Sequence, residues 1–150
     1  MGHINLSDAT PIYTGGITPR IRKGNVALIA QSGSAAISVI NSCTAGFSKV
    51  VTIGSEYRVT AADYLNWFAH DDNTAVVGLV LESIQDADKF ADAVDRIHAA
   101  GKAMVVLKVG RSAIGAQATL AHTGALIRNN DAFVGFVERY GVPIVNDYEE

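Results

Sequence analysis

Gly24-Asn-Val-Ala-Leu-Ile-Ala-Gln-Ser-Gly-Ser34 joins an apolar run to a group of small, hydroxylated residues. The run Val26–Ala30 is apolar on successive residues, which is typical of a strand covered on both faces of a parallel sheet. The serines and the glycine that follow are typical of the first turn of a helix. Similar apolar runs occur at Val50–Ile53, Ala75–Leu81 and Ala103–Leu107, and a weaker one at Val142–Val145.

Helical patterns separate these apolar runs. Thr60 and Asp63 have the spacing of a capping box at the start of one helix. Between Asp86 and Gly101, apolar residues recur every three or four positions, and charged residues occupy the other face. A similar stripe is made by Phe133, Phe136, Val137 and Tyr140. Because strands and helices alternate and crossovers are right-handed, we predict an α/β fold with a doubly wound, flavodoxin-like parallel sheet of about five strands.

Residues 1–23 lack any such period, because Pro11, Gly15, Gly16 and Pro19 interrupt it. We predict an irregular arm or linker there, and one domain over residues 24–150. The chain of 150 residues is 49% hydrophobic and 18% charged, which favours a globular domain with a sizeable core over a disordered segment.

Charge and cysteine content argue against several classes of function. The net charge is −3, whereas proteins that bind nucleic acid or anionic membranes normally carry a basic excess. One cysteine can form neither an internal disulfide nor a thiolate metal site. No apolar run approaches the roughly 20 residues of a membrane helix, and the first residues do not resemble a signal peptide. We therefore expect a soluble, cytoplasmic protein without nucleic-acid or membrane partners.

The predicted helix start at Ser32, Gly33 and Ser34 is a candidate anion site. Free backbone N–H groups, two hydroxyls and little side-chain bulk suit a phosphate or a carboxylate. The alternative is that a serine only caps the helix and the glycine only makes the turn, and the spacing alone favours neither. Gly110 and Ser112 form a weaker candidate of the same kind after the fourth apolar run.

His122 lies in a stretch rich in glycine and alanine, where the backbone can approach a ligand closely. A neutral imidazole is a good nucleophile toward phosphorus and can act as a general base, although most lone histidines are surface residues. Glu82 directly follows the run Ala75–Leu81, so its carboxylate could hold the imidazole N–H; alternatively it is an exposed acid or a helix cap. His3, His70 and His98 are expected to be structural or solvated. No histidines or acids have the spacing of metal ligands, and we predict no metal site.

Five segments of the chain carry a resemblance to a known family. They are Gly24–Ser34, Thr52-Ile-Gly-Ser-Glu56, Leu81-Glu-Ser-Ile84, Val106-Leu-Lys-Val-Gly-Arg-Ser112 and His122-Thr-Gly-Ala-Leu126. In this order they closely resemble the succinyl-CoA-ligase-like flavodoxin domain of NDP-forming acyl-CoA synthetases. The ordered set is specific, whereas any single motif is not.

The resemblance implies roles for individual residues. A histidine at the position of His122 is phosphorylated in the family, and Glu82 would orient and stabilise it. The phosphoryl group would be held by Ser32, Gly33, Ser34, Gly110, Ser112 and Gly124. Substrate contacts are implied for Gly54, Ser55 and Glu56, where Ser55 replaces the asparagine of many relatives.

The resemblance also implies a reaction and partners. An acid, CoA and ATP with Mg²⁺ would become acyl-CoA, ADP and phosphate, through an acyl phosphate and a phosphohistidine. The full enzyme would add a CoA-binding Rossmann domain, reached through residues 1–23, and an ATP-grasp domain. This domain alone would bind no cofactor, and a small carboxylic acid, CoA and ATP would be substrates of the full enzyme. We expect the chain to be a fragment that is inactive as a ligase on its own.

The sequence motifs leave two other functions open. Some relatives use the architecture without ligase chemistry, as in protein acetyltransferases, so the chain could be a non-catalytic regulatory or binding module. The presence of both His122 and Glu82 argues against this. A flavodoxin-type module for FMN or another nucleotide rests on fold analogy only.

The apolar composition also predicts self-association, as a homodimer, because a small domain that is 49% hydrophobic can leave an apolar patch exposed. Sedimentation over a wide range of concentrations measures this. A mass of 15.8 kDa at every concentration would contradict the prediction.

Overall fold

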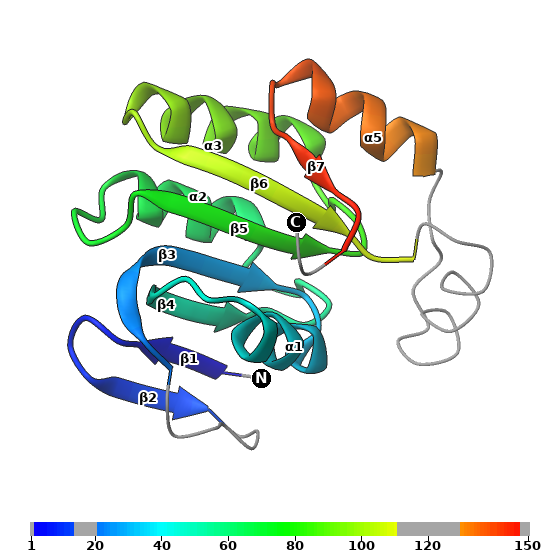
Figure 1. Cartoon of the computed structure of the whole chain (residues 1–150). Helices are drawn as coiled ribbons and strands as arrows, with labels where there is room; N and C mark the ends of the chain where they lie inside the picture. The colour runs from blue at the N-terminus through cyan, green and yellow to red at the C-terminus, as the bar shows by residue number, and fades with distance from the viewer. Residues whose placement is uncertain (1, 14–20, 111–129, 148–150) are drawn as a thin grey trace.

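The computed structural model describes residues 2–13, 21–110 and 130–147, and a seven-stranded sheet runs through these parts of the chain (Figure 1). The strand order is β2-β1-β4-β3-β5-β6-β7. The five strands from β3 to β7 are parallel, in the spatial order of a flavodoxin-like fold. The strands are β1 (Gly2–Asn5), β2 (Thr10–Tyr13), β3 (Lys23–Ala30), β4 (Phe47–Thr52), β5 (Val76–Leu81), β6 (Ala103–Lys108) and β7 (Ile144–Val145). The helices are α1 (Gly33–Ser42), α2 (Ala61–Ala69), α3 (Ala87–Ala99) and α5 (Asn130–Arg139).

The predicted doubly wound sheet is confirmed, but the prediction of about five strands is wrong. The additional strands β1 and β2 form an antiparallel hairpin at the sheet edge, inside the region predicted to be irregular. Pro11 is tolerated in β2 because an outermost strand has one side without a ladder. The turn of the hairpin is fixed by Asn5, whose Oδ1 accepts the backbone N–H groups of Ser7 at 3.1 Å and Asp8 at 3.2 Å. Strands of four residues are too short to show a clear period.

Helices cover both faces of the sheet. Figure 1 shows α2 and α3 on one face and α1 on the other. In β3, Ala27 and Ile29 point into the core beneath α2 and α3, while Leu28 and Ala30 point into the core beneath α1. All four side chains are at most 2% exposed. Burial on both faces is the reason why the run is apolar on successive residues.

Local sequence signals mark the start of α2 and both ends of α3. The capping box of α2 is confirmed: Thr60 Oγ1 accepts the backbone N–H of Asp63 at 3.4 Å, and Asp63 accepts that of Thr60 at 2.9 Å. Asp86 caps α3 by accepting the N–H of Lys89 at 3.0 Å. Gly101 follows α3 with a φ of +69°, a left-handed conformation that glycine adopts without strain.

A buried polar cluster fastens β4 to the end of α2, away from the carboxyl ends of the strands. Lys49 is 3% exposed, and its Nζ lies 2.6 Å from Asp71 Oδ2. Beside this ion pair, the hydroxyls of Ser48 and Thr74 are 2.8 Å apart. Because each buried polar group has a partner, the cluster avoids the cost of an unsatisfied group in the core.

Few large apolar side chains are exposed on the described surface: Ile12, Tyr57, Val59 and Trp67. Most of the described large apolar residues are therefore buried in, or packed against, the two cores. Within the described ranges, no helix has the length and apolar character that crossing a bilayer requires.

Candidate active site

The loops after β3, β4, β5 and β6 meet at one edge of the sheet, because these strands are parallel and end at the same level. Ala30, which ends β3, pairs with Thr52 at the end of β4 and with Val80 of β5. Leu81, which ends β5, pairs with Lys108 at the end of β6. Every candidate residue that the structure describes therefore lies in a loop or at a helix start at the carboxyl edge, where ligands bind in sheets of this type.

Ser32, Gly33 and Ser34 stay together at the start of α1. Ser32 Oγ accepts the backbone N–H of Ala35 at 3.4 Å and lies 2.9 Å from Ser34 Oγ. The hydroxyl of Tyr13 donates to the carbonyl of Gly33 at 3.2 Å, so the edge hairpin is tied to the helix start. Ser32 therefore caps α1. Whether this helix start also binds an anion stays a prediction.

Inorganic phosphate is expected to bind at this helix start, because first-turn N–H groups lack helical acceptors and α1 has no acidic residue in its first turn. A phosphate titration, followed through the amide chemical shifts of Gly33 and Ser34, should show saturable binding. Ser34→Asp should abolish it, because a carboxylate then occupies the place of the anion. The matched control, Ser42→Asp, adds the same charge at the other end of α1 and should bind normally. Equal loss in both variants would contradict the site.

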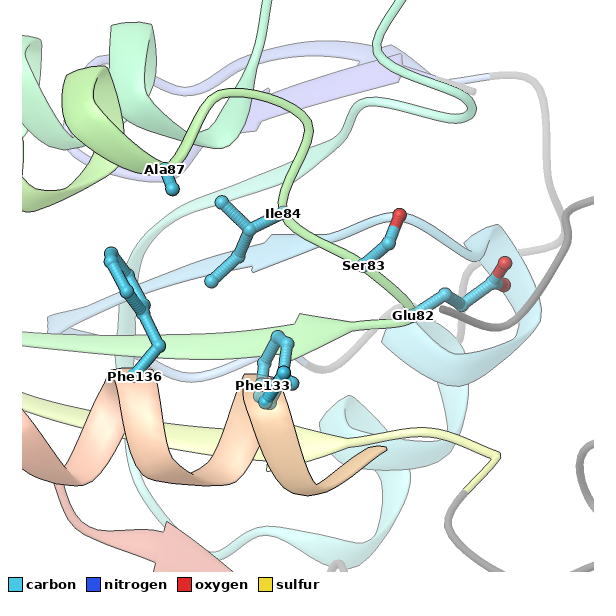
Figure 2. Close-up of a pocket in the computed structure, with 7 residues that line it drawn as sticks. Glu82, Ser83, Ile84, Ala87, Phe133 and Phe136 are labelled. Atoms are coloured by element: carbon cyan, nitrogen blue, oxygen red, sulfur yellow. The ribbon is translucent and has the colours of Figure 1, made fainter. Parts of the chain in front are cut away.

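Glu82 lies beside a cleft between the loop after β5 and the first turns of α5. The cleft has a volume of about 290 Å³. Figure 2 shows Phe133 and Phe136 of α5 facing Ile84 and Ala87 across it, while the carboxylate of Glu82 points away from the rings. The sequence indicated the two phenylalanines only as part of an apolar stripe. Their place beside Glu82 depends on how α5 packs against the sheet.

Gly54, Ser55 and Glu56, the predicted substrate contacts, lie in different environments. Gly54 and Glu56 have φ values of +62° and +55°, in the left-handed region that favours glycine. Ser55 is exposed, whereas Glu56 is only 8% exposed. The carboxylate of Glu56 accepts a hydrogen bond from the side chain of Gln31 and, at 3.3 Å, the backbone N–H of Ala61. Glu56 therefore ties its loop to two neighbouring elements, and substrate contact by these three residues stays a prediction.

Burial raises the pKa of Glu56 above its ordinary value, and this effect outweighs the hydrogen bonds from Gln31 and Ala61, which lower the pKa. The folded protein therefore binds the proton of Glu56 more tightly than the unfolded chain does, so protonated Glu56 stabilises the fold. This stabilisation is fully present below the unfolded pKa of 4.5 and is lost as the pH rises through the higher folded pKa. The free energy of unfolding of the wild type should therefore fall, relative to that of Glu56→Gln, as the pH rises above 4.5. Urea unfolding at several pH values measures this difference, and a constant difference would contradict it.

Gln31 connects three segments of the edge, a role that its residue type does not indicate. Its amide N–H groups donate to Glu56 and, at 2.8 Å, to the backbone oxygen of Ser83. Its amide oxygen accepts the backbone N–H groups of Glu82 and, at 3.1 Å, of Ser83. The available signal was its position, because a long polar side chain stands between a buried strand and a helix start.

The loop after β6 is described as far as Gly110, which has a φ of +77°. Lys108 is buried rather than solvated: its Nζ donates to the carbonyl of Val109 at 2.7 Å and lies 5.2 Å from the ring centroid of Phe133. Three further candidates lie outside the described residues, and their roles stay predictions: Ser112, His122 and Gly124.

The other histidines have local surroundings that account for them. His3 packs against Trp67, with 5.8 Å between the ring centroids, and burial lowers its pKa. His70 caps the end of α2, and His98 is exposed in the last turn of α3. Within the described ranges, no group of three or more His, Cys, Asp or Glu side chains is arranged to hold a metal ion.

Comparison with known proteins identifies relatives of this chain. The family described as "Succinyl-CoA ligase like flavodoxin domain" matches residues 23–150. The ADP-forming acetate–CoA ligase I of Archaeoglobus fulgidus is 32% identical over 153 residues, which cover 100% of this chain and 22% of the relative. The ADP-forming 4-hydroxybutyrate–CoA ligase of Nitrosopumilus maritimus is 30% identical over 154 residues, which again cover 100% of this chain and 22% of the relative.

A solved structure agrees with these sequence relatives. The "dinucleotide forming Acetyl-coenzyme A synthetase 1" of Ca. Korarchaeum cryptofilum, in complex with phosphate and ADP, superimposes with a TM-score of 0.84 and is 27% identical. The match covers 97% of this chain and 32% of that chain. Our chain spans only about a fifth of the curated relatives, 22% in both cases. The fold, the ordered motifs and these matches agree that the chain belongs to the family of succinyl-CoA ligase-like flavodoxin domains.

Proposed function

We propose that the chain is the phosphohistidine-carrying domain of an ADP-forming acid–CoA ligase. His122 takes the terminal phosphoryl group of ATP, and ADP leaves. The carboxylate of the acid then takes the phosphoryl group from His122, which gives an acyl phosphate. The thiol of CoA finally displaces phosphate from the acyl phosphate and forms the thioester.

The observation that carries this proposal is the meeting of a carboxylate and a helix start at one sheet edge. Glu82 directly follows the last residue of β5, and Ser32 and Ser34 lie at the start of α1, directly after β3. The two strand ends are adjacent, because Ala30 of β3 pairs with Val80 of β5. A carboxylate can hold an imidazole N–H and stabilise its charged form, and a helix start favours a phosphoryl group. The names of the two curated relatives, ligases of acetate and 4-hydroxybutyrate, support a small carboxylic acid as the substrate.

The remaining parts of the enzyme are proposed to lie in other domains, because the chain spans 22% of these relatives. An ATP-grasp domain would bind ATP with Mg²⁺, and a CoA-binding Rossmann domain would present the thiol. Residues 1–23 would lead toward the CoA-binding domain, with the β1–β2 hairpin attached to the edge of this one. The domain needs no cofactor of its own for these steps.

Incubation of the longer ligase with ATP labelled in the terminal phosphate tests the proposal. A label on this domain that is lost in acid and kept in base supports it. A ligase that forms the CoA ester without such a label would contradict it. A non-catalytic module would give neither label nor ester.

A further inference from the structure

We propose that Gln31 is a positioning residue that holds the backbone of Glu82 in place for phosphoryl transfer, an inference that rests on the proposed function. The side chain of Gln31 is 9% exposed and lies between the loops that follow β4 and β5. A glutamine amide has two N–H donors and an oxygen that can accept two hydrogen bonds. All four are used here, by Glu56, by the N–H of Glu82, and by both the N–H and the carbonyl of Ser83.

These bonds begin where the backbone ladder of β5 ends. The N–H of Gln31 donates to the carbonyl of Val80 at 3.0 Å, and that of Val109 to the carbonyl of Leu81 at 2.9 Å. The next two N–H groups, of Glu82 and Ser83, are bound by the Gln31 side chain instead. The side-chain amide of Gln31 thus continues the hydrogen bonding of the backbone beyond the end of β5. In this way it holds the Cα atom of Glu82, and with it the base of the Glu82 side chain, in a fixed position.

Glu56 fixes the orientation of this amide. An ionised carboxylate can only accept hydrogen bonds, so the nitrogen of Gln31 must face Glu56 and its oxygen must face Glu82. The other carboxylate oxygen of Glu56 accepts the N–H of Ala61, at the start of α2. Glu56 also has a φ of +55°, a conformation that an L-residue keeps only when its surroundings hold it. Three loops are therefore held together through two buried side chains.

Two variants separate this role from simple packing. Gln31→Met keeps the length of the side chain and removes all four hydrogen bonds. Hydrogen exchange in the full chain should then show lost protection at the amides of Glu82 and Ser83. In the longer ligase, phosphorylation by ATP should slow at least about tenfold, because small displacements of a reacting group are costly. The KM for ATP should not change, since we place ATP binding in another domain.

Gln31→Glu keeps an acceptor for the N–H of Glu82 but sets a second carboxylate against Glu56. At low pH one of the two carboxyls is protonated and restores the hydrogen bond; at higher pH both ionise and repel. The phosphorylation rate of this variant should therefore fall as the pH rises, with a limb that the wild type lacks. Among the residues that the structure describes, Asp63 of α2 and Lys89 of α3 also act on the charge of Glu56; they pair at 2.6 Å and are unchanged in these variants. The double variant Gln31→Glu/Glu56→Gln restores an amide–carboxylate pair and should remove this limb.

Ser48→Ala is the matched control, because it removes a buried hydrogen bond to Thr74 in the cluster on β4. It should cost stability without changing the exchange at Glu82 or the rate. Retained protection in Gln31→Met would overturn the inference, and so would a wild-type phosphorylation rate after protection is lost. If the wild-type ligase takes no phosphoryl group, the proposed function fails. The exchange result alone then decides whether Gln31 holds this backbone.

Discussion

His122→Ala should abolish both the phosphorylation of this domain and the formation of the CoA ester by the longer ligase. The imidazole is the proposed nucleophile, and alanine offers no atom that can take its place. Labelling with ATP, followed by assay of the CoA ester, measures both effects in one preparation. A rescue by another histidine is not expected, because His3 packs against Trp67 and His70 caps the end of α2.

The matched control is His98→Ala, which removes an exposed imidazole from the last turn of α3. This variant should take up the label and form the ester at the wild-type rate. Full labelling of His122→Ala would refute the assignment of the phosphoryl carrier. Loss of label in both variants would point to a general effect of histidine removal rather than to one carrier.

Glu82→Gln should slow phosphorylation of the domain by about 10²-fold and leave the fold intact. Glutamine keeps the shape of the side chain but lacks the charge that favours a positively charged phosphohistidine. The side-chain oxygen of Gln31 accepts the backbone N–H of residue 82, so a change of the side chain at 82 should not disturb this hydrogen bond. Rapid-quench measurement of label uptake gives the rate, and thermal unfolding checks the fold.

Glu138→Gln is the corresponding control, because it removes the same charge from an exposed position on α5. It should phosphorylate normally. If Glu82→Gln is also phosphorylated at the wild-type rate, Glu82 has no role in the reaction and is only an acidic residue at the end of a strand.

The central fold could be predicted from sequence because each buried strand carries its own signal. β3 is apolar on successive residues since Ala27 and Leu28 face different cores, and the capping box at Thr60 marks a helix start by local spacing alone. The β1–β2 hairpin gave no such signal. Its strands have four residues each, and β2 contains a proline that only the edge of a sheet accepts.

The candidate site was predictable in part for a similar reason. Loops after parallel strands share one edge, so the sequence alone places Ser32 and Glu82 at the same edge. The contacts of Gln31 could not be predicted in this way, because its partners Glu56 and Ser83 are separated from it by 25 and 52 positions in the sequence. The inward turn of Glu56 depends on a left-handed backbone that the residue type does not indicate.

The phosphoryl group can be located by mass spectrometry on the ATP-treated ligase, digested under basic conditions in which phosphohistidine survives. Trypsin cleaves after Arg111 and Arg128, so residues 112–128 form one peptide with His122 as its single histidine. We predict the added mass on this peptide, at His122, after treatment with ATP, and its loss when the acid substrate and CoA are added. A phosphoryl group on another residue, or turnover in which His122 is never phosphorylated, would contradict the proposed role of this domain.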